Sequence, residues 1–143
     1  MTTDPACEFC EIVARSAPAR IVFEDEDSLA FFPLNPASPG HTLVIPRVHI
    51  PDIWSLSRDQ ASPLLDTTLK VSRAIRTALR PDGLNIINSN GAAATQTIFH
   101  IHVHLVPRWH SDHFGNIWPP SSQRTDDTGD DVAEAIRQAI ESG

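Results

Sequence analysis

The stretch His100-Ile101-His102-Val103-His104 decides how the rest of the chain is interpreted. Side chains alternate between the two faces of a β-strand, so the three histidines point one way and the residues between them point the other. On a flat strand the neighbouring histidines lie about 6.6 Å apart and the outer pair about 13 Å apart. Metal–nitrogen bonds are only about 2 Å long, so at most one of the three suits a single metal ion. The others need another role, and neutral imidazole serves as a nucleophile, a proton carrier or a donor facing phosphate.

Composition limits the class of protein. The chain has 143 residues, 41% of them hydrophobic, which is enough for one domain over residues 1–143 with its own core. The net charge of -7 argues against nucleic acid or an anionic membrane as a partner, whereas a small phosphorylated ligand stays compatible. The sequence shows no secretory leader and no apolar run of membrane-spanning length, so we expect a cytoplasmic protein.

The hydrophobic pattern predicts an α+β fold in which a mostly antiparallel sheet packs against one long helix. That helix is expected over about 57–79, where Leu64, Val71 and Ile75 recur at three- and four-residue spacing. Strands are expected over 21–24, 28–32, 41–45 and 84–88, and through the histidines. A short helix is expected from Cys7, and a terminal helix over 130–141 with a start signal at Thr128 in an extension beyond the 7–118 core.

Several short motifs together resemble the histidine-triad (HIT) family of nucleotide-binding hydrolases. They are Pro39-Gly40-His41, Asn90-Gly91, Gln96-Thr97, the histidine stretch and Pro107-Arg108. The resemblance runs from about Cys7 to Arg108 and continues weakly to Trp118. It implies a HIT-like fold with a five-stranded sheet in each half of a homodimer, and cleavage of nucleotides at the α-phosphorus.

The resemblance also implies roles for individual residues. His102 is expected to attack phosphorus and form a nucleotidyl-imidazole intermediate, held at Nδ1 by the backbone carbonyl of His100. His104 is expected to donate to a phosphate oxygen, and Gln96 to orient the leaving group or water. Backbone N–H groups over 95–97 and the Thr97 hydroxyl are expected to bind the remaining oxygens.

A second group of residues is expected to bind the nucleotide, a purine nucleotide by the same resemblance. His41 is expected near the nucleotide, Phe23 and Leu34 are expected to flank the base, and Ser89, Asn90 and Thr95 are expected to line the substrate site. No organic cofactor is implied.

Three positions depart from the family pattern. The residue eight before His41, usually an acid or amide that grips the ribose, is Pro33, which has no side-chain donor or acceptor. Asn35 is the neighbouring candidate for that role. Ser89 replaces a common asparagine, and Thr95 replaces the usual glycine before Gln96.

The pair Cys7-x-x-Cys10 has three interpretations. A redox pair would follow a strand in a βαβ unit, and no such strand precedes it. Two free thiols are the simplest interpretation, and a structural Zn²⁺ is the other. Some bacterial relatives bind zinc through this pair together with two histidines, which correspond here to His49 and His100, so we expect zinc to tie the N-terminus to the sheet.

Three functions follow from these patterns. The first is a nucleotidyl hydrolase acting on dinucleoside polyphosphates or nucleoside phosphoramidates; the others are a non-catalytic nucleotide-binding or sensing protein, and a nucleotidyltransferase.

Activity is expected to fall below about pH 6.5, where a free imidazole becomes protonated. His110 and His113 are expected in solvent, and Trp54, Trp109 and Trp118 in packing or dimer contacts.

Overall fold

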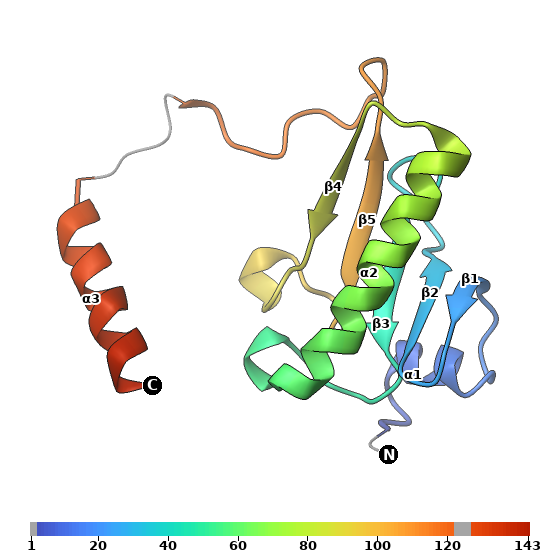
Figure 1. The fold of residues 1–143 in the computed structure, drawn as a ribbon, viewed down its shortest axis with the longest axis horizontal. Coiled ribbons are helices and arrows are strands. Elements are labelled where there is room, and N and C mark those ends of the chain that lie inside the picture. Colours follow the sequence, from blue (N-terminus) through green and yellow to red (C-terminus); the bar gives the residue numbers. More distant parts are fainter. Residues whose placement is uncertain (1–2, 122–126) are drawn as a thin grey trace.

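The computed structural model describes residues 3–121 and 127–143 (Figure 1). Five strands form one antiparallel sheet in the order β1-β2-β3-β5-β4. Their bounds are β1 Arg20–Glu24, β2 Ser28–Phe32, β3 Thr42–Pro46, β4 Gly83–Ile87 and β5 Val103–Arg108. Three α-helices accompany the sheet, α1 Glu8–Val13, α2 Arg58–Leu79 and α3 Gly129–Ser142. The α+β fold with a five-stranded sheet and one long helix is therefore confirmed.

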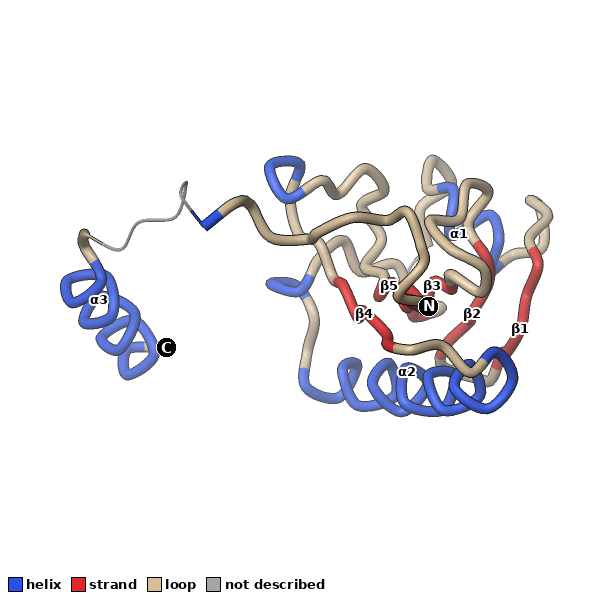
Figure 2. Tube along the Cα trace, turned by 90° about the horizontal axis from the view of Figure 1, so that it is seen from above, coloured by secondary structure: helices blue, strands red, loops and turns tan. Residues whose placement is uncertain are grey.

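The helix α2 covers one face of the sheet (Figure 2). Ser57 begins it with a capping box, in which Ser57 and Gln60 satisfy each other's backbone N–H groups. Its buried residues are Leu64, Thr67, Thr68, Val71 and Ile75, so the period of the sequence placed the buried face correctly. The apolar ones, Leu64, Val71 and Ile75, pack on Ala30, Val44 and Leu105 of the strands.

The other face of the sheet carries α1 and a second apolar cluster (Figure 2). Phe9 and Cys10 of α1 pack there against Leu29, Phe31, Leu43 and Ile45. Because Leu43 lies opposite His104 in the β3–β5 register, the histidines belong to this face. The sheet therefore separates a helix-covered core from the side on which the imidazoles lie.

The histidine stretch is only partly a strand. The prediction placed His100 and His102 in the strand, but β5 begins at Val103. Before that residue the backbone is held by other partners: Ile101 N–H donates to Ile50 O at 2.6 Å, and Asn88 Nδ2 donates to His102 O at 3.0 Å. The alternation still holds, because Ile101 joins the helix-side core while His102 contacts Phe9 on the opposite face.

The C-terminal helix stands apart from the sheet on the side of β4 (Figure 1). It matches the predicted range and begins directly after Thr128, with Asp130 and Asp131 in its first turn, although Thr128 makes no side-chain cap. Trp54 and Trp118 are 76% and 75% exposed, so neither packs within this chain as one interpretation had it. In the described part of the chain, no helix combines the length and apolar character that crossing a bilayer requires.

Candidate functional site

The centre of the site is His102, whose ring is oriented by the backbone. Its Nδ1 lies 2.8 Å from the carbonyl oxygen of His100, and a carbonyl only accepts, so Nδ1 carries the hydrogen. The neutral ring then has its lone pair on Nε2. Asn88 fixes the carbonyl of His102 itself at 3.0 Å, so the residue is held from both sides.

A second chain of hydrogen bonds sets the proton of His104. The backbone N–H of Ala37 donates to His41 Nδ1 at 3.0 Å, so His41 carries its own hydrogen on Nε2. That hydrogen is donated to His104 Nδ1, 3.0 Å away. His104 Nδ1 is thus an acceptor, and its remaining hydrogen is on Nε2. The ring centroids of His102 and His104 are 4.9 Å apart, which puts an acceptor imidazole beside a donor imidazole.

Burial keeps these rings neutral. It lowers the pKa of His41, and it lowers the pKa of His102 against the opposing effect of the His100 carbonyl. The pKa of His104 falls to about 4, first through burial and then through the neighbouring His102 and His41. At neutral pH each ring therefore presents one lone pair and one N–H, as a nucleophile and a donor require.

Phe9 is a residue of this site that the sequence interpretation did not single out. Its ring meets that of His102 edge-on with centroids 5.1 Å apart, and that of Phe31 at 5.3 Å. The apolar cluster with Leu43 thus directly adjoins His102. The only signal was its place between the two cysteines, on the face that α1 turns to the sheet. Because Phe9, Phe31 and Leu43 are all buried, their role here is to pack against the His102 ring and hold it in place.

Of the two residues expected at the base, Phe23 lies on the other face of the sheet, whereas the role of the exposed Leu34 stays a prediction. Phe23 lies opposite Ala30 and packs with the helix-side core, with Lys70 Nζ 4.6 Å from its ring centroid. It is therefore on the far face of the sheet from His102. Leu34 is 94% exposed after β2. Pairing register decides the face of a strand residue, and the sequence did not reveal it here.

The loop before the histidines is held by side-chain amides, and Gln96 is the most buried of them. Gln96 Oε1 accepts from Gly91 N–H at 2.8 Å, and Nε2 donates to Pro51 O at 2.8 Å and Ile98 O at 3.2 Å. Both amide hydrogens are thereby used, and the side chain is only 3% exposed. In this ligand-free arrangement Gln96 braces the loop, and its role toward the leaving group or water stays a prediction.

Other residues of this loop also make hydrogen bonds within the protein. Asn90 accepts from Ile53 N–H at 2.7 Å and donates to Asn88 Oδ1, so it supports Asn88. Thr95 N–H and Gln96 N–H donate within the loop to Ala92 O and Gly91 O. Of the expected phosphate donors over 95–97, the exposed Thr97 with its hydroxyl is the one that these bonds leave available, and Ser89 lies half-buried before the loop.

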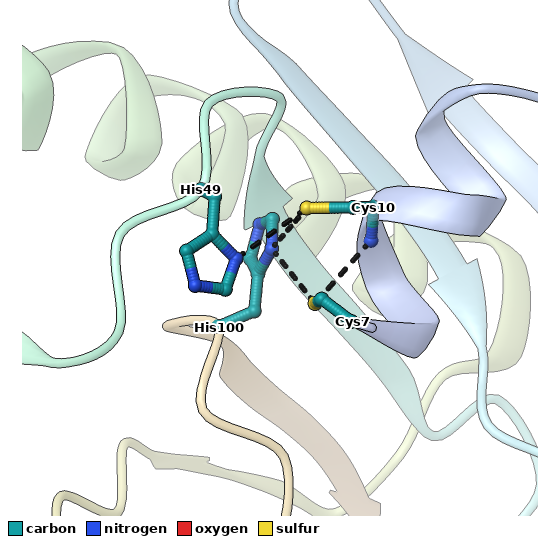
Figure 3. Close-up of side chains that lie close together, drawn as sticks. All are labelled: Cys7, Cys10, His49 and His100. Carbon is teal, nitrogen blue, oxygen red and sulfur yellow. Dashed lines mark hydrogen bonds between the residues drawn. The ribbon is translucent and has the colours of Figure 1, made fainter. Parts of the chain in front are cut away.

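The four predicted metal ligands come together at the edge of this site (Figure 3). The ligand atoms of Cys7, Cys10, His49 and His100 all lie within 4.8 Å of one another. His100 Nδ1 is 3.5 Å from each sulfur, and His49 Nδ1 is 3.4 Å from Cys10 Sγ. With Zn–S of about 2.3 Å and Zn–N of about 2.0 Å, tetrahedral geometry separates sulfur from nitrogen by about 3.5 Å. The donor set and its spacing therefore fit Zn²⁺.

Hydrogen-bond partners of the two histidines leave their Nδ1 atoms free to bind a metal. His100 Nε2 donates to Pro46 O at 2.8 Å, which leaves the Nδ1 lone pair for a metal, as the second shell of zinc sites commonly does. His49 Nε2 lies 3.9 Å from Asp4 Oδ2, and a hydrogen on Nε2 would likewise leave the Nδ1 lone pair of His49 for a metal. Burial raises the pKa of the Cys7 thiol, a cost that a bound cation would offset. The cluster thus suggests zinc from its own geometry.

A hollow of about 560 Å³ lies at the other end of β4 and β5. It contains Arg108, whose guanidinium is held by Asp112 at 2.9 Å and Asn85 at 2.7 Å. The cation that would recruit a phosphate there is already neutralised. None of the predicted site residues lines this hollow, so we assign the site to the histidine face.

The fold and the site together define a class of protein: a small α+β domain with a row of oriented neutral imidazoles next to a Cys₂His₂ cluster. The family profile described as the HIT domain matches residues 14–111. The chain belongs to the HIT family.

Individual relatives agree with this assignment. Protein hit of Bacillus subtilis is 42% identical over 113 residues, which are 78% of each chain. A crystal structure from Streptococcus mutans has a TM-score of 0.87 at 43% identity, covering 96% of this chain and 87% of that one. A zinc-bound histidine triad family protein from Mycobacterium smegmatis has a TM-score of 0.73 at 34% identity, covering 96% of this chain and 98% of that one. Adenylylsulfatase HINT3 of Arabidopsis thaliana is 35% identical over 118 residues, 82% of this chain and 58% of that protein.

Proposed function

We propose that this protein is a nucleotidyl hydrolase that cleaves at the α-phosphorus of a purine nucleotide derivative. The observation that carries the proposal is the hydrogen bond from His102 Nδ1–H to the His100 carbonyl, which directs the Nε2 lone pair away from the backbone. The relative named as an adenylylsulfatase supports a hydrolase in general terms. Dinucleoside polyphosphates and nucleoside phosphoramidates are the substrate classes that we propose.

The reaction is proposed to proceed in two displacements. In the first, His102 Nε2 attacks phosphorus, a P–N bond forms, and the bond to the leaving oxygen or nitrogen breaks with its electron pair. The His104 Nε2–H donates to a non-bridging phosphate oxygen as charge develops there. In the second, water attacks the same phosphorus and the P–N bond breaks. The leaving group takes up a proton from solvent in the first step and water releases one in the second, so nucleoside monophosphate and a neutral His102 result. His41 holds the tautomer of His104 throughout.

Zinc is proposed to have a structural role at Cys7, Cys10, His49 and His100. When bound, the ion would supply a cross-link between the N-terminal helix and the sheet, without contact with the substrate. The two thiols are free cysteines in the structure, a state that fits a reducing compartment such as the cytoplasm. We also propose a homodimer.

A non-catalytic nucleotide-binding protein is the second candidate, and Pro33 is the observation that favours it, because a proline cannot grip a ribose hydroxyl. A substrate panel separates the two functions: diadenosine polyphosphates, adenylyl sulfate and an adenosine phosphoramidate, assayed with the wild type, His102→Ala and the exposed control His113→Ala. Hydrolysis lost only in His102→Ala, with an acid-quenched adduct on His102 in the wild type, supports the hydrolase. Equal binding of AMP by all three proteins without turnover would establish the binding function instead.

A further inference from the structure

The helix α3 presents an apolar stripe that no residue of 3–121 or 127–143 covers. Val132, Ile136 and Ile140 are 49%, 55% and 73% exposed, and the helix has no buried residue. Their four-residue spacing puts them on one side of the helix. An isolated helix of 14 residues is only marginally stable in water. A surface that buries this stripe is therefore needed to hold the helix.

That surface is not the body of the same chain. In both views α3 stands clear of the sheet and of α2, beyond the strand β4 (Figures 1 and 2). The Streptococcus mutans structure covers 96% of this chain with a TM-score of 0.87. The remaining 4% of 143 residues is about six residues, fewer than the 14 of α3. The similarity to a solved protein therefore extends into this detached helix, and a helix held away from its own body needs another molecule as support.

The charges of α3 indicate what kind of surface this is. The helix contains Asp130, Asp131, Glu134 and Glu141 but a single cation, Arg137. The last part of α2 has the opposite composition: from Lys70 to its cap Arg80 it contains four cations and no carboxylate. Opposite charges on two helices favour their association and fix its register.

The geometry of α2 places these cations together. Leu69, Arg73, Arg76 and Arg80 follow at spacings of four, three and four residues, so they form one stripe on the side away from the buried Val71 and Ile75. Leu69 is 42% exposed, and all four residues lie on the open surface. Within the described ranges, 3–121 and 127–143, no carboxylate forms an ion pair with the three arginines. We call this set the α2 stripe.

We propose that α3 is an arm that docks on the α2 stripe of a second copy of this chain. A second copy has the complementary surface by construction, and a two-fold arrangement exchanges one arm in each direction. The strand β4 supports this choice, because it is an open sheet edge on the same side as α3, with Ile86 56% exposed. The exchange goes beyond the proposed hydrolysis, since no residue of the histidine site takes part in it.

The test is a photo-crosslink in the full chain, with p-benzoylphenylalanine in place of Ile136 or, as the matched control, Gln138 on the polar side of the same helix. The Ile136 probe should give a product of twice the 15.7 kDa chain mass, with the crosslinked peptide from residues 69–80, and the Gln138 probe should give much less. A crosslink within one chain, to another segment, or none at all would overturn the proposal.

A charge reversal tests the recognition itself. Arg73→Glu with Arg76→Glu should lower the yield of the intermolecular product about tenfold, the effect of reversing two partly exposed ion pairs. The control Arg58→Glu makes the same change at the other end of α2 and should keep the yield. Circular dichroism checks that the helices of every variant are intact, and an unchanged yield in the double variant would refute the assigned surface. Both readouts are independent of nucleotide turnover.

Discussion

The low pKa of His104 makes a quantitative prediction about stability in mild acid. A histidine in the unfolded chain titrates near 6.5, whereas burial and the neighbouring imidazoles lower the pKa of His104 to about 4 in the folded protein. As the pH falls below 6.5, the histidine binds a proton in the unfolded state, whereas in the folded state it stays neutral until the pH approaches 4. The stabilisation is therefore complete above pH 6.5 and is lost as the pH falls toward 4.

The magnitude follows from the two values. Between pH 7.5 and pH 5 this one group should remove about 2 kcal/mol from the free energy of unfolding. Urea denaturation at the two pH values, on the wild type and His104→Gln, isolates the contribution, because the other groups titrate in both proteins. His113→Gln, which removes an exposed histidine, should retain the wild-type pH dependence. If wild type and His104→Gln lose the same stability on acidification, the neutral His104 inferred from the structure is wrong.

Three further predictions concern other parts of the site. Thr95 has a positive φ of 71°, which is strained for a β-branched residue, so Thr95→Gly should raise the free energy of unfolding by about 1 kcal/mol in a urea titration; a decrease would show that the backbone there is not strained. Pro33→Asp should tighten AMP relative to dAMP about tenfold in calorimetry, through a new bond to the ribose; an unchanged ratio would mean that the ribose is held elsewhere. Cys10→Ser should reduce the zinc content from about one per chain and the unfolding free energy by about 3 kcal/mol, whereas full stability in a metal-free wild type would contradict a structural metal.

The same pKa shifts revise the expected pH profile of the reaction. From the sequence alone, activity was expected to fall below about pH 6.5, the value of a free imidazole. Burial lowers the pKa of His102 and His41 as well as that of His104, so the neutral rings persist to more acidic pH. The fall in turnover is therefore expected well below pH 6.5. The sequence predicted the common face of the histidines but contained no measure of their burial.

The fold was predictable because its signals are local and periodic. The spacing of Leu64, Val71 and Ile75 fixed the buried face of α2, and Ser57 gave its beginning. The four predicted ligands lie together even though Cys7 and His100 are 93 residues apart. That prediction depended on resemblance, since no periodicity relates a helix start to a strand. The local hydrophobic pattern thus predicted the long helix, and the family motifs predicted the metal ligands.

The positions that the sequence did not predict share one physical cause: the hydrogen-bond partners of a loop side chain and the register of an edge strand are set by the folded structure. Gln96 was expected to face the substrate, yet three backbone groups of its own surroundings take its amide. Phe23 was expected at the base, and its pairing with Ala30 turns it to α2. Phe9 was not assigned to the site because the flanking cysteines gave the stronger signal, although its ring contacts that of His102.

His100 connects the two halves of the site through two different atoms. Its ring Nδ1 faces both sulfurs of the cysteine pair, while its backbone oxygen fixes the hydrogen of His102. The ring is fully buried and its far nitrogen is tied to Pro46, so the residue has little freedom to turn. A shift of the metal cluster would therefore displace the carbonyl that selects the tautomer of His102. On this geometry, we infer that a metal bound there would help to hold the carbonyl that keeps the lone pair of His102 on Nε2.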